Sequence, residues 1–332
     1  MHNVLVTGGA GFVGSHTVLS LIKNSYKPII IDNFENSHKI IIDKIKKITN
    51  KNIIFLKGDV LDSKFINKIF KNYKINIVIH FAAHKSVFES IKNPLKYYQN
   101  NVVGTLNILR SMNEFNVSKI IFSSSATIYG SPKFLPITEK HPLNAINPYG
   151  QTKIDIENIL FNICKSNKNF SAVSLRYFNP IGADETINIG EYPKNNSSNL
   201  MPTLCFAAKY NKIINIYGKN YNTKDGTAIR DYIHVTDVAN GHVSAIKYII
   251  KNKGLNFFNL GTGKGTSVLE VIKTFEKVNN IYFKKKFFSR RDGDPESTYA
   301  SVYKAKKILN WKAQYNLSTM CKSSWEWAKK YY

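Results

Sequence analysis

Glycines recur at every third position between the first predicted strand and the first predicted helix of this chain of 332 residues. The strand covers residues 3–7 (NVLVT), the glycines are Gly8, Gly11 and Gly14, and an apolar-periodic helix is predicted over residues 15–23. Glycine at such a turn lets a pyrophosphate approach the backbone, and the helix N-terminus favours its negative charge. The spacing is one residue looser than the strict dinucleotide fingerprint, but its place between strand and helix predicts a dinucleotide-binding unit.

Further apolar strands alternate with helices through the first half of the chain. We predict strands at residues 28–32, 52–59, 75–83 and 119–123, each almost continuously apolar, as in a parallel sheet covered on both faces. The alternation predicts an α/β fold with a doubly wound parallel Rossmann sheet over residues 1–180. Ligands of such sheets bind at the carboxyl ends of the strands.

Acidic and small residues mark those strand ends. Asp32 lies roughly 20 residues beyond the glycines, where a carboxylate would bind the adenosine ribose hydroxyls and repel a 2′-phosphate. This favours NAD over NADP, although a turn or helix-capping Asp is the alternative. Asp59 ends the third strand and is placed to meet the adenine. The other strand ends carry residues 82–83 (AA), 123–125 (SSS) and 178–179 (FN).

A Tyr and a Lys follow the strand that ends in residues 123–125. Pro148 introduces a predicted helix that carries Tyr149 and Lys153 one turn apart on the same face. Together with a hydroxyl from the strand end, the pair suits removal of a proton from an alcohol while a hydride leaves its carbon. A surface Tyr beside a solvated Lys is the alternative.

Three other Tyr-x-x-x-Lys pairs test how specific this pattern is, and they begin at Tyr129, Tyr282 and Tyr303. Tyr129 is followed by Gly130 and Pro132, which oppose a helix. Tyr282 lies in an aromatic and basic run that predicts a strand, and Tyr303 is predicted to be helical but lacks a preceding hydroxyl-tipped strand. Only Tyr149 has both the strand and the helix.

Composition limits the class of protein. An apolar fraction of 43% supports a full core, and no apolar run approaches the roughly 20 residues of a membrane span. The beginning of the sequence shows no signal or transit peptide. The cysteines Cys164, Cys205 and Cys321 are scattered, which indicates reduced thiols in a cytoplasmic protein and no metal site.

The formal charge of +25 has two interpretations, a nucleic-acid partner or attraction of anionic small substrates. Lysines are spread along the whole chain among many Asn and Ile, so we favour drift towards AT-rich codons as their origin. Basic clusters occur at residues 44–47 and 284–291, and a solvated face is the alternative for the first. We expect no specific nucleic-acid partner and no membrane.

The second half of the chain has a different texture. We expect residues 181–332 to form a smaller mixed α/β substrate domain, with segments around 231–262 returning to the first domain. Residues 180–227 predict loops with one helix near 200–210, strands are predicted at 228–235 and 257–261, and helices at 268–279, 301–310 and around Trp325 and Trp327. Arg230 and Arg291 are the best candidates to grip a diphosphate, since a guanidinium binds phosphate oxygens in a bidentate manner, although each could be a surface ion pair.

A set of motifs in this order resembles the extended short-chain dehydrogenase/reductase family. They are residues 7–16 (TGGAGFVGSH), 32–37 (DNFENS), 80–85 (HFAAHK), 97–101 (YYQNN), 123–130 (SSSATIYG), 175–180 (LRYFNP), 199–202 (NLMP) and 225–235 (DGTAIRDYIHV). The likeness covers nearly the whole chain and is greatest to the members that epimerise UDP-hexoses at C4. It implies interconversion of UDP-glucose and UDP-galactose by transient oxidation at C4, hydride transfer to tightly bound NAD, rotation of the 4-keto sugar and hydride return. It also implies a homodimer and a role in galactose metabolism.

The resemblance also implies roles for individual residues. Tyr149 would be the base, acidified by the Lys153 ammonium and the nicotinamide cation, and Ser125 would bond the reacting oxygen. The implied NAD ligands are Gly8, Gly11, Phe12, Val13, Gly14, Asp32, Asn33, Asn36, Ser37, Asp59, Val60, Phe81, Ala82, Ala83, Lys85, Asn100, Ser123, Tyr149, Lys153 and Phe178. The implied substrate ligands are Lys85, Ser125, Tyr149, Asn179, Asn199, Leu200, Tyr217, Arg230, Arg291, Asp294 and Thr298.

Several positions depart from the family pattern. Phe88 stands where many members have Gly, near Lys85, and Ser301 and Tyr303 replace an Asp and a Ser before the last helices. Thr298 falls where members carry either a bulky Tyr or a small residue beside the hexose. Because a small residue leaves room for an N-acetyl group, we hypothesise that UDP-GlcNAc and UDP-GalNAc are also accepted.

Three rival functions remain at this stage. A nucleotide-sugar 4,6-dehydratase needs an extra acid beside the Ser-Thr position, and residues 125–127 (SAT) offer none. An NADP-dependent reductase would prefer a basic residue in place of Asp32. A nucleic-acid-binding protein with a catalytically idle fold would explain the charge, but Ser125, Tyr149 and Lys153 argue against it.

Overall fold

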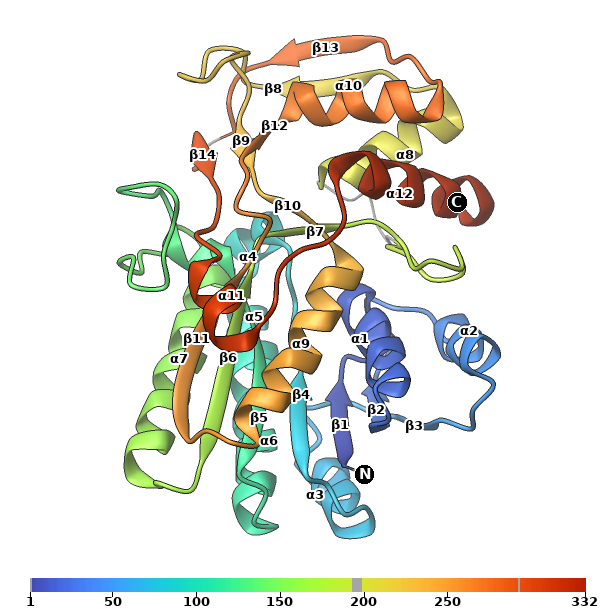
Figure 1. Ribbon diagram of the computed structural model, residues 1–332. Helices are drawn as coiled ribbons and strands as arrows, with labels where there is room; N and C mark the ends of the chain where they lie inside the picture. Colours follow the sequence, from blue (N-terminus) through green and yellow to red (C-terminus); the bar gives the residue numbers. More distant parts are fainter. Residues whose placement is uncertain (1, 193–198, 292) are drawn as a thin grey trace.

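The computed structural model describes residues 2–192, 199–291 and 293–332. Its centre is a seven-stranded sheet in the order β11-β6-β5-β4-β1-β2-β3, and every neighbouring pair is parallel (Figure 1). The strands are β1 Asn3–Thr7, β2 Lys27–Asp32, β3 Ile54–Lys57, β4 Ile77–His80, β5 Lys119–Ser125, β6 Ser171–Tyr177 and β11 Gly254–Leu260. The predicted doubly wound parallel sheet is therefore confirmed.

The alternation of side chains along the strands builds two cores, one on each face of the sheet. On β1, Val4 and Val6 pack into the core formed with α1, α2 and α9, whereas Leu5 faces the core formed with α3, α6 and α7. The helices of these layers are α1 Phe12–Lys23, α2 Ile40–Thr49, α3 Ser63–Asn72, α6 Gly104–Glu114, α7 Pro148–Ser166 and α9 Val235–Ile249.

A second lobe lies above the carboxyl ends of the strands (Figure 1). Its core joins α8, α10 and α12 to β8, with Leu204, Ile214, Phe275 and Trp327 buried inside. Its elements are β7 Asn179–Ile181, α8 Leu200–Tyr210, β8 Ile214–Tyr217, β9 Ile229–Arg230, β10 Tyr232–His234, β12 Thr266–Ser267, α10 Val268–Asn279, β13 Lys285–Phe288, β14 Ser297–Thr298 and α12 Leu317–Tyr331. The helix α11 Tyr303–Leu309 packs instead on α9 and β11 of the first lobe. Residues 193–198, which the predicted loop region includes, lie outside the described residues.

Asparagine, rather than the more usual glycine, ends four helices of this chain. The residue after each of α2, α8, α10 and α11 adopts the left-handed conformation, and these residues are Asn50, Asn211, Asn280 and Asn310. Asn tolerates this conformation because its short amide can bond locally. Some of the many Asn residues of this sequence therefore have a structural role at helix ends.

The structure corrects several predicted boundaries. The single strand predicted at 228–235 is two short strands, because β9 pairs with β12 and β14 whereas β10 pairs with β7. Asp231 separates them, and its buried carboxylate accepts Thr262 N, Gly263 N and Ala300 N. The helix of α9 then begins at Val235. Tyr282 is not in a strand, since β13 begins at Lys285.

The chain between β4 and β5 is divided into four short helical segments. The chain forms α4 Val87–Lys92, α5 Pro94–Tyr97, the π-helix η1 Tyr98–Val103 and α6 in succession. A π-helix is rare and often occurs at functional sites. Two segments of the second half rejoin the first, since α9 packs on α1 and β11 pairs with β6. The division into domains at residue 180 stays a prediction.

Candidate active site

The glycine turn after β1 forms a cradle for a pyrophosphate. Gly8 has a φ of +69°, and a Cβ there would lie 2.7 Å from Ala82 N, while a Cβ on Gly14 would lie 2.2 Å from Gly8 O. Gly11 is the N-cap residue of α1 and makes no side-chain hydrogen bond to the first turn of this helix. The first N–H groups of a helix, here those of Phe12 and Val13, have no intrahelical partner and can bind an anion. The turn therefore fits NAD.

Asp32 and Asp59 lie next to this turn at the ends of β2 and β3. The buried Asp32 carboxylate accepts Ala10 N at 3.0 Å, Phe34 N at 2.9 Å and Ser37 Oγ at 2.7 Å. Asp59 accepts Asn33 Nδ2 at 2.8 Å. A carboxylate has about four acceptor positions, so Asp32 retains capacity for a ribose hydroxyl. Its protein donors hold it in place for that contact.

Other predicted NAD ligands line the same strand ends. Residues 81–83 extend beyond β4 and are half-buried, with Ala82 N donating to Thr7 Oγ1 at 3.3 Å. Asn100 lies on the π-helix, where its Nδ2 donates to Asn101 Oδ1 at 2.9 Å. Four further candidates have these positions. Asn36 lies beside His84, and Val60 lies against Gly104. The ring of Phe81 contacts that of His242, and Phe178 is buried.

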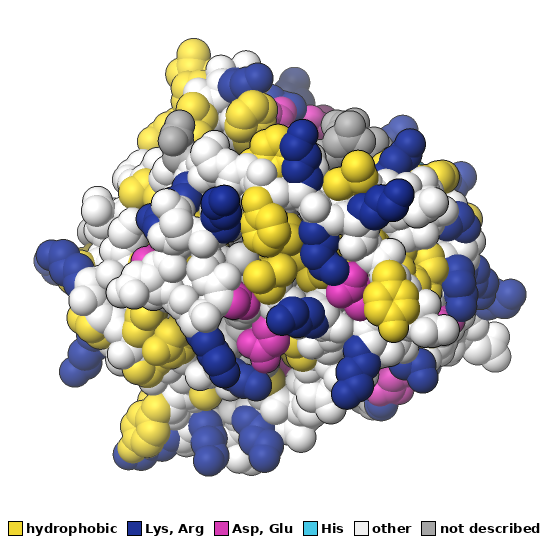
Figure 2. Space-filling model, turned by 90° about the horizontal axis from the view of Figure 1, so that it is seen from above, with side chains coloured by type: hydrophobic (Ala, Val, Ile, Leu, Met, Phe, Trp, Pro, Cys, Tyr) yellow, Lys and Arg dark blue, Asp and Glu magenta, His cyan; other side chains and the backbone are white. Residues whose placement is uncertain are grey.

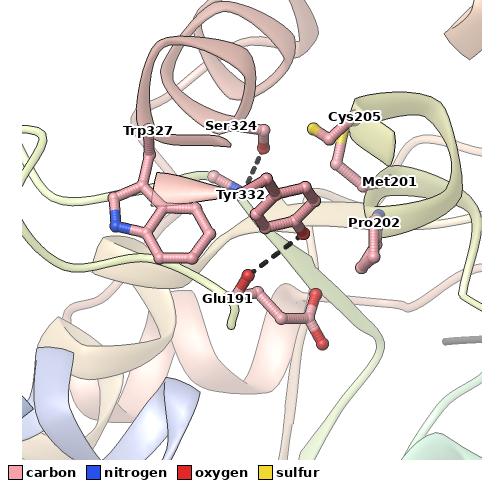
Figure 3. Close-up of a pocket in the computed structure, with 8 residues that line it drawn as sticks. Glu191, Met201, Pro202, Cys205, Ser324, Trp327 and Tyr332 are labelled. Atoms are coloured by element: carbon pink, nitrogen blue, oxygen red, sulfur yellow. Dashed lines mark hydrogen bonds between the residues drawn. The ribbon is translucent and has the colours of Figure 1, made fainter. Parts of the chain in front are cut away.

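Lys85 lies differently from the other candidates. Its side chain is 60% exposed, and its Nζ lies 3.1 Å from Glu191 Oε1, on the loop of the second lobe that follows β7. Figure 3 shows Glu191 at a small cavity between α8 and α12, where Tyr332 OH donates to its backbone oxygen at 3.3 Å. Lys85 thus links the two lobes, and its contact with a ligand stays a prediction.

Tyr149 and Lys153 sit on the first turns of α7, as predicted. The helix begins at Pro148, and the Asn147 side chain caps it by accepting Gly150 N at 2.8 Å. Lys153 is buried, its Nζ donates to Ser123 O at 2.7 Å, and it lies 5.8 Å from the centre of the Tyr149 ring. The first turns of α7 and the end of β5 therefore meet at Tyr149, Lys153 and Ser123.

Burial controls the charge of this pair. It lowers the pKa of Lys153 to about 7, while Glu157, one turn further along α7, opposes the shift. Burial also raises the pKa of Tyr149, and a hydrogen bond with Ser125 offsets only part of that rise. The resemblance implied that the Lys153 ammonium lowers the pKa of the Tyr149 phenol. In the protein without ligand this pKa is raised instead, because desolvation outweighs the stabilising contact with Ser125. A contribution from the nicotinamide stays a prediction.

Ser125 ends β5 with its hydroxyl bonded to Thr127. The two Oγ atoms lie 2.9 Å apart, and Thr127 N donates to Ser125 Oγ at 3.2 Å, which begins the short 3₁₀ helix η2 Ala126–Tyr129. This turn directs the Ser125 hydroxyl towards Tyr149. No carboxylate is present in residues 125–127, so the acid required by a 4,6-dehydratase is missing at this position.

The sequence interpretation missed a buried polar network beneath the pair. Glu157 accepts Ser124 Oγ at 2.7 Å and Ser174 Oγ at 2.6 Å, and forms an ion pair with Arg176 at 2.6 Å. Tyr177 was also missed, and its hydroxyl bonds that of Ser123. Glu157 could have been found, since it lies four residues after Lys153 on one helical face.

The predicted substrate ligands of the second lobe come together around β8, β9 and β14. Arg230 forms an ion pair with Asp294, and Thr298 pairs with Arg230 in the register of β14 and β9. The guanidinium of Arg291 lies 4.2 Å from the centre of the Tyr217 ring. Two arginines and an aromatic face thus adjoin, which suits an anionic nucleotide.

Asn179, Asn199 and Leu200 lie on neighbouring elements of this lobe. Asn179 opens β7 with an exposed side chain, Asn199 is the N-cap residue of α8, and Leu200 is the first residue of that helix.

Among the described residues no group of three or more His, Cys, Asp or Glu side chains is placed to hold a metal ion. Within the same residues, no helix has both the length and the apolar character of a membrane span.

Known proteins share both the sequence and the site. A family model described as GDP-mannose 4,6 dehydratase matches residues 5–324. The UDP-glucose 4-epimerase of Dictyostelium discoideum is 46% identical over 98% of this chain and 95% of its own length. The chain belongs to the UDP-glucose 4-epimerase family. The parallel sheet of the epimerase family is the sheet described above.

Solved structures of epimerases superpose on the whole chain. The UDP-glucose 4-epimerase of Bifidobacterium longum, in complex with NAD⁺ and UDP, is 44% identical with a TM-score of 0.96 and covers 99% of this chain and 98% of its own. The enzyme of Stenotrophomonas maltophila, with bound NAD and formylated UDP-arabinopyranose, is 38% identical with a TM-score of 0.97 at the same coverage. Dinucleotide binding at the glycine turn is therefore expected in an epimerase of this fold.

Proposed function

We propose that the protein interconverts UDP-glucose and UDP-galactose as an NAD-dependent 4-epimerase. The observation that carries this proposal is the meeting of Tyr149, Ser125 and Lys153 at the carboxyl end of β5, next to a glycine turn that fits NAD. Membership of the epimerase family supports the reaction and the cofactor. Galactose metabolism follows as the setting of this reaction.

The chain's own groups divide the work between proton and sugar. Bound NAD supplies the hydride acceptor and donor for the sugar C4 carbon. Tyr149 takes the proton of the C4 hydroxyl and later returns it, while the Ser125 hydroxyl orients the reacting oxygen. Lys153, fixed by the carbonyl of Ser123, supplies positive charge when protonated, which favours the phenolate.

The second lobe holds the nucleotide. Arg230 and Arg291 have the charge and geometry to bind the diphosphate, and Asp294 orients the guanidinium of Arg230. Epimerisation requires the sugar to present both faces to the cofactor. Binding energy is therefore placed on the nucleotide, remote from the reacting carbon, while the hexose is held loosely.

A direct test uses the purified protein. Denaturation should release NAD, and the native protein should convert UDP-galactose to UDP-glucose without added cofactor. Release of NADP, or retention on DNA without turnover of a nucleotide sugar, would contradict the proposal.

Figure 2 shows Lys and Arg side chains scattered among other residue types over the upper face, which favours the compositional origin of the charge.

We also propose that UDP-GlcNAc is a substrate, on the basis of Thr298. Its side chain is small, and its strand partner is the proposed diphosphate ligand Arg230. A Thr298→Tyr variant should lose turnover of UDP-GlcNAc and keep that of UDP-galactose. Wild-type protein that leaves UDP-GlcNAc unchanged would contradict this extension.

A homodimer is proposed from an exposed apolar face. Val87, Phe88, Ile91 and Leu95 are exposed on α4 and α5, and Leu95 is 82% exposed. Both helices pack on α7, which itself exposes Phe161. Such a face in a soluble enzyme marks an interaction site, and a second copy is the occupant we propose. Light scattering should give twice the mass of 37.8 kDa.

A matched pair of variants tests the dimer. Leu95→Lys should shift the protein towards the monomer, whereas Ile308→Lys, exposed on α11, should not. A monomeric wild type would contradict the proposal.

We further propose a cytoplasmic location, which suits three buried cysteines without disulfides and a cytoplasmic pool of nucleotide sugars.

A further inference from the structure

Tyr221 carries a buried hydroxyl that no hydrogen bond in the described residues accounts for. The residue is 5% exposed, and its hydroxyl oxygen has no partner among the described residues. Buried polar groups in folded proteins are nearly always hydrogen-bonded, so such a group needs an explanation.

The ring of Tyr221 is held on all sides. Tyr221 N donates to Gly226 O at 3.0 Å, and Gly218 packs so closely that a Cβ there would lie 2.3 Å from Tyr221 Cε2. Arg290 covers the ring with its guanidinium 4.1 Å from the ring centre, and Asn220 Oδ1 accepts Arg290 Nε at 2.8 Å. These contacts fix the orientation of the ring, and the Tyr221 hydroxyl makes no hydrogen bond within the described residues.

Three arginines and a carboxylate of the described residues act on the phenol. Burial and Asp294 raise the pKa of Tyr221, and Arg230, Arg290 and Arg291 oppose that rise. Arg230 and Arg291 are the proposed diphosphate ligands, and Asp294 is already paired with Arg230. A phenol in this environment lacks an acceptor, and an anion bound by the same arginines would supply one.

We propose that the Tyr221 hydroxyl donates a hydrogen bond to a phosphate oxygen of the UDP portion of the substrate. The inference rests on the proposed function and adds a ligand to the same site. Its role is to hold the nucleotide, remote from C4, and it takes no part in the chemistry of the sugar. A water molecule or a purely structural role for the hydroxyl is the alternative.

The experiment titrates UDP into wild-type holoenzyme, Tyr221→Phe and Tyr282→Phe by calorimetry. Tyr282 is 87% exposed on the same lobe and serves as the matched control, with unchanged affinity expected. Loss of a bond to a charged group should weaken UDP binding of Tyr221→Phe about tenfold or more. The KM for UDP-galactose should rise by a similar factor with kcat retained.

Thermal unfolding without UDP separates binding from structure. Since Phe removes an unsatisfied hydroxyl, the Tyr221→Phe variant should unfold at the same temperature as wild type or higher. A lower unfolding temperature, or UDP affinity equal to that of wild type, would overturn the role of Tyr221 alone. Failure of wild-type protein to bind UDP would overturn the proposed function as well, so the two failures are distinguishable.

Discussion

Glu157 lies one helical turn beyond Lys153 on α7, and its carboxylate also holds the guanidinium of Arg176 on β6. The same carboxylate accepts the hydroxyls of Ser124 and Ser174 from two neighbouring strands. The helix that bears the proposed base is thereby tied to the strand that bears Ser125. Glu157 touches no reacting atom, so its effect on catalysis is one of position and charge.

Replacement of Glu157 by Gln should destabilise the protein strongly. The variant leaves the buried charge of Arg176 without its partner, and loss of one member of a buried pair costs about 3–5 kcal/mol of unfolding free energy. Glu326→Gln is the control, because its pair with Lys329 is exposed and should contribute less than about 1 kcal/mol. Urea unfolding measures both, and equal losses would contradict the interpretation.

The buried Lys153 should make stability depend on pH. Its folded-state pKa of about 7 lies below the ordinary value of 10.5, so between these values the unfolded chain binds a proton that the folded protein lacks. The unfolding free energy should therefore rise with pH by about 1 kcal/mol per unit relative to a Lys153→Met variant. His80, the neighbouring buried imidazole, is neutral throughout because burial lowers its pKa to about 3.

Urea unfolding of the two proteins at pH 6, 8 and 10 measures this difference. The stability gap should be constant below pH 7 and should widen in favour of wild type above it. A gap that stays the same across the range would show that Lys153 keeps its ordinary pKa in the folded protein. The absolute size of the gap is not the test, since the variant also loses the bond to Ser123 O.

A Tyr149→Phe variant should keep its cofactor and lose activity. Without the phenol no group accepts the C4 proton, and we expect turnover of UDP-galactose to fall about 10²-fold or more. Tyr303→Phe is the matched control, because Tyr303 also precedes a Lys by four residues on a helix but is 68% exposed. Comparable losses in the two variants would argue against Tyr149 as the base.

A Gly14→Ala variant should lose NAD. The added methyl would meet Gly8 O at 2.2 Å, so the turn that receives the pyrophosphate must open. Gly254→Ala is the control, because Gly254 has a φ of +79° but nothing lies within 4 Å of its added Cβ. NAD released on denaturation should fall only in the first variant, and normal cofactor content there would contradict the proposed cradle.

The sequence predicted the parts of the site that depend on local pattern. The strand that ends at Ser125 and the helix that begins at Pro148 were found because apolar runs, Pro and capping residues act within a few residues. Arg230 was named from the chemistry of its guanidinium, whereas Asp294 and Thr298 were named through family resemblance, and the roles of all three stay predictions. No short-range pattern links residues 64 positions apart.

Other features lay beyond sequence reasoning for physical reasons. The network of Glu157 and Arg176 joins a helix to two strands and becomes visible only when they pack. The break between β9 and β10 at Asp231 involves backbone donors from distant loops and different strand partners on either side, which override the β propensity of residues 228–235. Likewise, the missing partner of Tyr221 is a property of packing and not of pattern.

The place of β11 at one border of the central sheet has a consequence for biosynthesis. Because β11 pairs with β6 and follows the whole of β7 to β10 in the chain, a nascent polypeptide that has emerged only as far as β6 leaves that strand's backbone unpaired on one side. Unpaired strand borders promote association with other chains. A fragment truncated near residue 180 would therefore expose the backbone of β6, which β11 pairs with in the whole chain, and it should aggregate.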